Sequence, residues 1–230
     1  MTREQKHNLY HASLDIIKVP QWNFKKLNKE RETRDFGEGF YTCKEVAYPL
    51  YLYCGNNAVT LNEYKFTDNG LNILHLKNDV KWLLTVAFHR SDFSKRRKYH
   101  PLRDKIREYI SSFDLIIGTI SNDNYFSTMD DFIRNLIPDT VAIEIAQMMS
   151  FGVQYVSKSA KADAQFVYLD SQHYDNSHLI PYRERKAQER ELMDERVEER
   201  RVDLYPWNTG KLFAQIIEEV WADVESWYKQ

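Results

Sequence analysis

The chain has 230 residues, and its 32 Lys and Arg nearly balance its 34 Asp and Glu, which gives a formal net charge of -2. With 43% apolar and 29% charged residues, this balance is typical of a soluble globular protein and excludes a global attraction to nucleic acids or membranes. No apolar stretch approaches the roughly 20 residues of a membrane span, and the first ten residues lack the apolar core of a secretory signal, so we expect a cytoplasmic protein. Cys43 and Cys54 form no CxxC pair, which argues against a disulfide framework or a structural zinc site.

The first half of the chain predicts short strands separated by polar turns. Four segments rich in β-branched and aromatic residues are the candidate strands: residues 9–13, 39–43, 59–66 and 71–76. Two segments with apolar side chains at helical spacing are candidate helices: residues 44–53 and 79–88. The short apolar run at residues 114–121 ends in polar residues and fits a buried strand that leads into a loop.

The second half predicts more helix. Residues 129–149 indicate a mostly helical segment, and residues 151–159 indicate a strand. Residues 159–169 fit a short helix or turn that leads into a final strand. Because strands and helices do not alternate as regular βαβ units, we expect the α+β class.

The composition changes near residue 171, so we expect a domain at residues 1–170 and a helical extension at residues 171–230. From residue 183 to residue 202, 14 of 20 residues are charged, which predicts a solvated helix with ion pairs between successive turns. After Asn208 and Thr209 as candidate caps, one apolar stripe predicts an amphipathic helix: Phe213, Ile217, Val220, Val224 and Trp227. Packing of this stripe on its own domain is the preferred interpretation, and a partner interface or self-association is the alternative.

Residues 95–107 form the one dense basic segment of the sequence. A solvated loop followed by the start of a helix accounts for it as well as a phosphate-binding surface does. The sequence favours neither interpretation.

Three short segments carry the functional signal, because the GxSxG, HExxH, Walker A and GxGxxG motifs are all absent. These segments are Leu9–Ser13 (LYHAS), Asp35–Thr42 (DFGEGFYT) and Gln154–Val156 (QYV). Taken singly, each has an ordinary structural interpretation. In this order, they resemble the His, Tyr and Glu signature of the ADP-ribosyltransferases of the diphtheria-toxin and poly-ADP-ribose polymerase branch.

More specifically, the chain resembles a bacterial family of proteins of unknown function that is assigned to this superfamily. Five segments carry the resemblance, which spans about residues 8 to 170: LYHAS, DFGEGFYT, LNEYKF, DLIIGTISND and VQYVSKS. It implies an ADP-ribosyltransferase-like fold in which two small, mostly antiparallel sheets flank an NAD cleft.

The same resemblance implies transfer of ADP-ribose from NAD to a macromolecular acceptor, a protein or a nucleic acid, with release of nicotinamide. It also implies a role as a bacterial toxin or phage-defence effector, for which an antitoxin is a candidate partner. Two alternatives stay open: an NAD glycohydrolase, in which water is the acceptor, and a catalytically silent nucleotide-binding module.

The resemblance assigns His11 to a ribose hydroxyl, the backbone of Ala12 to the nicotinamide amide and the ring of Tyr41 to the nicotinamide ring. A second aromatic face comes from Tyr48, Tyr51 or Tyr53, and Gly37 and Gly39 let the backbone approach NAD. The catalytic residues implied are His11, Tyr41 and Gln154. The cofactor contacts implied are Tyr10, His11, Ala12, Ser13, Gly37, Gly39, Phe40, Tyr41, Thr42, Tyr51 and Asp123.

Two positions depart from the pattern, because Ala12 replaces a Gly and Gln154 replaces the Glu of the transferase branch. A Gln can hydrogen bond a ribose hydroxyl, but it cannot act as a general base. The acceptor must therefore already be nucleophilic, or another carboxylate must serve, with Asp123 as the first candidate. Arg34 and Asp35 flank the glycine turn as further candidate cofactor contacts. On the sequence alone, Gln154→Glu is expected to preserve or raise turnover, because a carboxylate adds negative charge near an oxocarbenium ion.

Overall fold

A computed structural model describes residues 6–23, 34–94, 96–121, 126–148, 152–206 and 209–229. Asp123 and Asn208 lie outside these residues. The strands are β1 (Lys6–Ser13), β2 (Phe40–Cys43), β3 (Val59–Thr67), β4 (Ile73–Leu76), β5 (Leu115–Thr119), β6 (Val153–Ser157) and β7 (Phe166–Tyr174). The helices are α1 (Ala47–Tyr53), α2 (Val80–Arg90), α3 (His100–Ser111), α4 (Phe126–Ile133), α5 (Asp139–Gln147), α6 (Ala160–Asp163), α7 (Asn176–Asp203), α8 (Phe213–Ala222) and α9 (Val224–Lys229).

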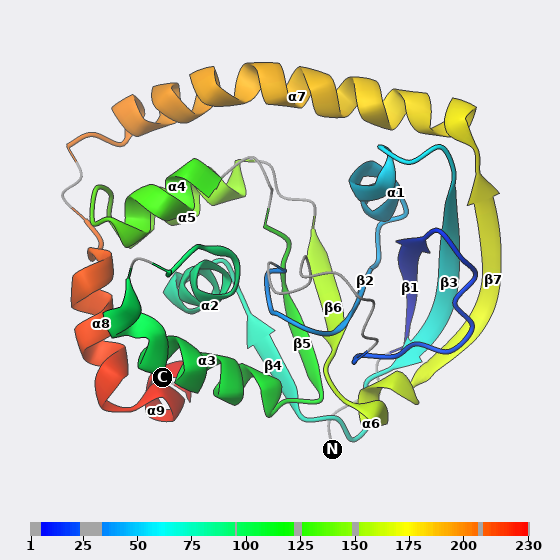
Figure 1. Ribbon diagram of the computed structural model, residues 1–230, viewed down its shortest axis with the longest axis horizontal. Helices are drawn as coiled ribbons and strands as arrows, with labels where there is room; N and C mark the ends of the chain where they lie inside the picture. The colour runs from blue at the N-terminus through cyan, green and yellow to red at the C-terminus, as the bar shows by residue number, and fades with distance from the viewer. Residues whose placement is uncertain are drawn as a thin grey trace.

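The seven strands form one mixed sheet in the order β4-β5-β6-β2-β1-β3-β7 (Figure 1). The predicted α+β class is confirmed, but the prediction of two separate sheets is wrong. Within the described residues, however, β1 pairs with β2 at one register position, Tyr10 opposite Cys43. In contrast, β1 pairs with β3 along its whole length, from Lys6 opposite Thr67 to Ser13 opposite Thr60. The sheet is therefore almost divided between β1 and β2, into a large half (β4, β5, β6 and β2) and a small half (β1, β3 and β7).

The large half is covered by helices that share one apolar core. Trp82, Phe88 and Phe132 are fully buried in it. Asp79 begins α2 by accepting hydrogen bonds from the backbone N–H groups of Lys81 and Trp82, as an N-cap residue does. This cap fixes the start of a helix whose side chains are buried from Trp82 to His89.

A second core, which is aromatic, packs side chains of the small half against Phe40 of β2. The rings of Phe40, Tyr64 and Phe166 pack edge to face with centroids 5.7 Å apart in each pair, a favoured geometry for aromatic side chains. On the other side of this half, α1 packs through Leu50, which is buried with Leu61 of β3. Because β1 pairs with β3 along its whole length, the other edge of β1 faces the division in the sheet.

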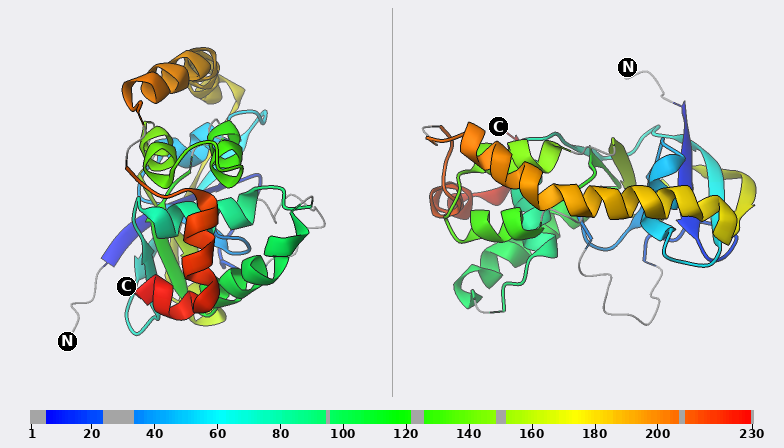
Figure 2. Two further views of the ribbon diagram at one scale, coloured as in Figure 1. Left: turned by 90° about the vertical axis from the view of Figure 1, so that its left-hand side faces the viewer. Right: turned by 90° about the horizontal axis from the view of Figure 1, so that it is seen from above.

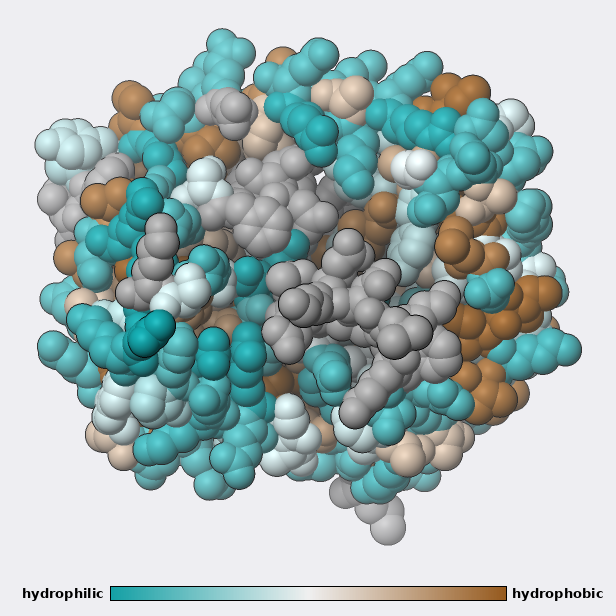
Figure 3. All heavy atoms as spheres, viewed as in Figure 1, coloured by the Kyte–Doolittle hydropathy of each residue, from teal (hydrophilic) through white to brown (hydrophobic). Residues whose placement is uncertain are grey.

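Helix α7 crosses from the small half to the large half (Figures 1 and 2). Near its start, Leu179 is buried in the small half, and near its end Met193 and Val197 are buried in the core of the large half. An ion pair of 2.5 Å joins Arg201 to Asp131 of α4. The predicted solvated helix is confirmed, and hydrophilic side chains dominate the edge of the molecule where α7 lies (Figure 3). Because one end of α7 packs against the small half and the other end packs against the large half, the helix links the two halves of the sheet.

The C-terminal stripe is buried within the protein. Phe213, Ile217, Val220, Val224 and Trp227 are each at most 9% exposed, on two helices separated by Asp223. Their burial confirms the preferred interpretation and accounts for the stripe without a partner. Among the described residues, no helix combines the length and apolar character that a bilayer span requires.

Candidate functional site

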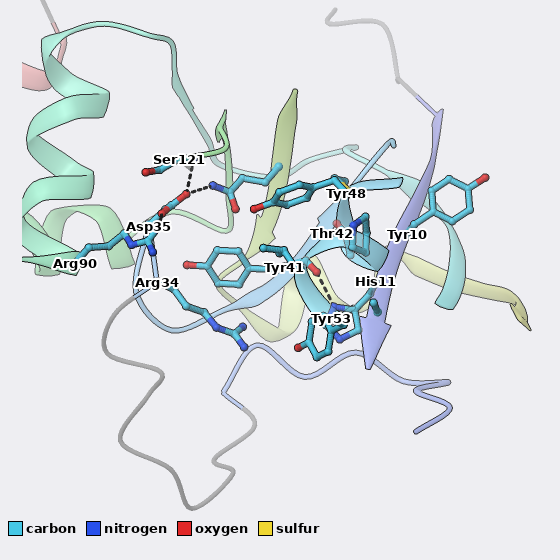
Figure 4. A pocket seen from close by; sticks show the side chains of 15 residues that line it. Tyr10, His11, Arg34, Asp35, Tyr41, Thr42, Tyr48, Tyr53, Arg90 and Ser121 are labelled. Carbon is cyan, nitrogen blue, oxygen red and sulfur yellow. Dashed lines mark hydrogen bonds and ion pairs between the residues drawn. The ribbon is translucent and has the colours of Figure 1, made fainter. Parts of the chain in front are cut away.

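A pocket of about 230 Å³ opens where the sheet divides (Figure 4). Strands β1, β2 and β6, helix α1 and the end of α2 contribute to it. The residues that line it are Tyr10, His11, Ala12, Arg34, Asp35, Tyr41, Thr42, Cys43, Tyr48, Pro49, Leu52, Tyr53, Arg90, Ser121 and Gln154. The three residues expected to be catalytic, which are up to 143 positions apart in the sequence, therefore meet in one pocket.

His11 is on β1, directly after Tyr10, the residue at which β1 pairs with β2. Its Nδ1 is 2.7 Å from the carbonyl oxygen of Tyr41. Because a carbonyl oxygen only accepts, Nδ1 carries a proton, and in the neutral ring Nε2 is then the acceptor. The ring also contacts Phe40, with centroids 4.5 Å apart. His11 is thus held in one orientation by a strand on each side of the division.

Tyr41 is fixed at both its ring and its hydroxyl group. The hydroxyl donates to the carbonyl of Gly37 at 2.7 Å and accepts from the backbone N–H of Phe36 at 3.1 Å. The guanidinium of Arg34 lies 5.0 Å from the ring centroid, in cation–π geometry. Desolvation by burial raises the pKa of Tyr41 above its usual value, so the phenol stays protonated and cannot act as a base at neutral pH.

Gln154 is buried and makes two hydrogen bonds through the same atom. Its Nε2 donates to Oδ2 of Asp35 at 2.7 Å and to the carbonyl oxygen of Thr119 at 3.3 Å. Thr119 ends β5, which lies beside β6 in the sheet, and Gly118 is opposite Gln154 in the register. Both acceptors therefore lie on the same side of the amide.

Asp35 connects Gln154 to the large half of the sheet. Its Oδ1 forms an ion pair of 2.7 Å with Arg90 of α2, and its Oδ2 also accepts from the backbone N–H of Ser121 at 2.9 Å (Figure 4). Asp35 is 5% exposed. It is the one carboxylate among the described residues that line the pocket.

The glycine turn is held by Lys158, which the sequence did not single out. The Nζ of Lys158 donates to the carbonyl oxygens of Phe36 and Glu38. Gly37 has a φ of +73°, and a Cβ there would come within 2.9 Å of His89. A Cβ at Gly39 would meet Val156 of β6 at 2.5 Å. Both glycines are thus required for close packing against β6 and α2, and their role in an approach to NAD stays a prediction.

Two of the three candidate aromatic residues reach the pocket. Tyr48 and Tyr53 line it, whereas the hydroxyl of Tyr51 donates to Glu189 of α7 at 2.7 Å, outside the pocket. Tyr51 therefore joins α1 to α7, and its contact with NAD stays a prediction. Tyr51 holds the helix that carries the other two rings.

The remaining expected contacts divide into two groups. Tyr10, Ala12 and Thr42 line the pocket, although the hydroxyl of Tyr10 is directed away from it (Figure 4) and contacts Glu63. Ser13, Gly37, Gly39, Phe40 and Tyr51 are not among the lining residues, and Asp123 lies outside the described part of the chain.

Five lining residues were not singled out from the sequence, although Ser121 lies within the DLIIGTISND segment: Cys43, Pro49, Leu52, Arg90 and Ser121. Burial raises the pKa of the Cys43 thiol to about 12, so it is not a nucleophile at neutral pH. The described residues contain no group of three His, Cys, Asp or Glu arranged to hold a metal ion.

The basic segment is engaged in structural contacts. Arg96 pairs with Asp130, Arg103 pairs with Asp104, and Arg107 donates to the carbonyl of Phe88. These contacts favour the interpretation of the segment as a solvated loop and helix start.

The sequence matches one family model, described as "Protein of unknown function (DUF3990)", over residues 7–168. No curated protein matches the chain. Among solved structures, the M. tuberculosis MbcT-MbcA toxin–antitoxin complex contains a chain that is similar at 9% identity and a TM-score of 0.36. That comparison covers 78% of this chain and 90% of the other.

Proposed function

The chain belongs to the DUF3990 family, and we propose that it transfers ADP-ribose from NAD to a macromolecular acceptor with release of nicotinamide. One observation carries the proposal. His11, Tyr41 and Gln154 come from three different strands and meet at a single pocket where the sheet divides. The resemblance assigns these three positions to NAD, and separate structural roles would not require them to converge.

The pocket suits one end of a dinucleotide. Its volume of about 230 Å³ is below the range of about 300–1,000 Å³ common for sites that enclose a whole ligand. We assign it to nicotinamide and the adjoining ribose, with Tyr41 beside the nicotinamide ring and Tyr48 or Tyr53 opposite. Arg34 places positive charge at the pocket, which is complementary to the diphosphate, whereas the charge of Arg90 is paired with Asp35.

The chemistry of the pocket limits the acceptor. Asp35 accepts three hydrogen bonds and is almost fully buried, so it is poorly placed to remove a proton from an acceptor. Two possibilities follow: the acceptor is already nucleophilic at neutral pH, or Asp123, which lies outside the described residues, serves as the base. We propose the biological role, a toxin or phage-defence effector with a possible antitoxin partner, from the resemblance alone.

The test is incubation of the protein with NAD labelled in its adenylate part and a bacterial lysate. Transfer predicts label on macromolecules, and treatment with nuclease or protease then identifies the acceptor class. Free labelled ADP-ribose without labelled macromolecules would indicate a glycohydrolase, and intact NAD would indicate a binding module. Gln154→Ala is the matched inactive control, because it removes one contact assigned to the ribose.

A further inference from the structure

Gln154 is surrounded by hydrogen-bond acceptors. The Oδ2 of Asp35 and the carbonyl oxygen of Thr119 both lie within hydrogen-bond distance of Nε2. A Gln amide has two N–H bonds, and these two acceptors use both. The orientation of the amide is thereby fixed, and Oε1 is the polar atom left to face the pocket.

A carboxylate at position 154 would meet the same two oxygens. One carboxylate oxygen would replace Nε2, at 2.7 Å from Asp35 and 3.3 Å from the carbonyl of Thr119. Like charges at this separation strongly disfavour ionisation of both groups. The site is thus built for an amide, which reverses the expectation from sequence that Gln154→Glu would preserve turnover.

Asp35 is itself held rigidly. Arg90 binds one of its oxygens and the backbone N–H of Ser121 binds the other, so that the carboxylate cannot turn away from Gln154. Both Asp35 and Arg90 are nearly excluded from water, with side-chain exposures of 6% and 10%. In such surroundings, hydrogen bonds polarise one another more strongly than in water.

Resting on the proposed function, we propose that Asp35 is a positioning residue that acts on the ribose through Gln154. Its hydrogen bond turns the amide so that Oε1 accepts from a ribose hydroxyl, and its charge increases the negative partial charge on Oε1. As the glycosidic C–N bond breaks, its electron pair leaves with nicotinamide and positive charge develops on the ribose beside Oε1. A lone pair of the acceptor then forms the new bond to the same ribose carbon, and any acceptor proton goes to solvent.

The experiment measures kcat and KM for nicotinamide release by wild type, Asp35→Asn, Gln154→Glu and the double variant. We expect Asp35→Asn to lower kcat by about 10- to 100-fold, as loss of an outer partner does at metal ligands, while KM for NAD changes little. Gln154→Glu should lower kcat as well. The double variant again pairs one amide with one carboxylate, so its loss should be at least tenfold smaller than the product of the two single losses.

Asp114→Asn is the matched control. Asp114 is also a hydrogen-bonded carboxylate, in contact with Ser159 and Lys161, but it lies outside the pocket. This variant should keep its kcat even where its stability falls. Multiplicative losses in the double variant, or a Gln154→Glu enzyme with full turnover, would overturn the proposal.

A second measurement needs no NAD. The unfolding midpoint of Gln154→Glu, relative to wild type, should fall as the pH rises from 5 to 8, because the two facing carboxyl groups are then both driven to ionise. Arg90 of α2 pairs with Asp35, and Arg34, which precedes Asp35 in the chain, lies over the ring of Tyr41; neither arginine changes charge in this range. If the difference in unfolding midpoint between Gln154→Glu and wild type did not change with pH, the repulsion between carboxylates at positions 35 and 154 would be refuted. Wild type that releases no nicotinamide would instead refute the proposed function.

Discussion

The Nδ1 atom of His11 lies 2.7 Å from the carbonyl oxygen of Tyr41, at the point where β1 and β2 cease to pair. The side chain of His11 here provides the hydrogen bond that a backbone N–H of β1 would otherwise donate to β2. The division in the sheet therefore does not leave the carbonyl of Tyr41 unsatisfied, and it orients both residues toward the same space.

Replacing His11 tests this arrangement. His11→Ala should raise the KM for NAD by about fivefold or more, because a hydrogen bond contributes about 1 kcal/mol, with a smaller change in kcat. His11→Gln is the control that retains a polar side chain. If the histidine-like limb of the pH–rate profile vanished in His11→Gln while turnover persisted, His11 would instead act in proton transfer.

Tyr41 offers a pair of variants that separate its ring from its hydroxyl. Tyr41→Ala should weaken NAD binding by about 0.5–1.5 kcal/mol, the contribution of an aromatic pair. Tyr41→Phe keeps the ring and should bind NAD nearly as wild type, while losing stability because Gly37 and Phe36 lose their hydroxyl partner. Calorimetry on both variants gives the comparison. Equal affinity of wild type and a folded Tyr41→Ala would remove the ring from the site.

His89 should make the protein sensitive to acid. Burial lowers its pKa to about 3 in the folded state, against about 6.5 in an unfolded chain. Below pH 6.5, the unfolded chain binds a proton that the folded protein does not, so the free energy of unfolding falls by about 1.4 kcal/mol per pH unit until pH approaches 3.

The measurement is urea unfolding at pH 7 and pH 5, in wild type and in His89→Gln. Wild type should lose about 2 kcal/mol more than the variant over this interval. Parallel losses in the two proteins would contradict the assignment of the acid sensitivity to His89.

Helix α8 carries a stability prediction with an internal control. Phe213 is fully buried and packs against Phe88, Phe93 and Phe132, so Phe213→Ala should cost about 3–5 kcal/mol of unfolding free energy. Trp221 on the same helix is 42% exposed, and its replacement by Ala should cost much less. Denaturant unfolding of both variants measures the two losses of unfolding free energy. Similar losses would show that the stripe is not the buried face.

Strands and helices that are marked by a local spacing of apolar residues could be predicted from the sequence. The strand of residues 59–66 was recognised because its periodicity reflects burial within a single element. The burial of the C-terminal apolar stripe was also predictable, but the expected single helix is two helices separated at Asp223. The expected helix at residues 129–149 is instead two helices, because Asn135 adopts a φ of 62° and Pro138 precedes the second. A turn of this kind interrupts a helical pattern without altering its apolar spacing.

The pocket residues that lie in recognised motifs could be predicted from the sequence, whereas the contacts that the other residues make could not. His11, Tyr41 and Gln154 were found because the resemblance names them in order. The contact between Asp35 and Gln154 joins residues 119 positions apart, and Arg90 enters from the end of a helix with no motif of its own. Such contacts depend on the sheet order, which no local pattern encodes.

Helix α7 has a geometric consequence for the pocket. Its 28 residues span about 42 Å at 1.5 Å per residue, and its two anchored ends lie on opposite sides of the division in the sheet. Inserting one residue between Leu179 and Met193 would rotate the far end by about 100° and carry Met193 out of phase with its core. Inserting seven would nearly restore the phase but lengthen the span by about 10 Å. Rotation and length at this helix can thus be changed separately, and the pocket, which α7 does not line, reports the effect of each change on the spacing of the two halves.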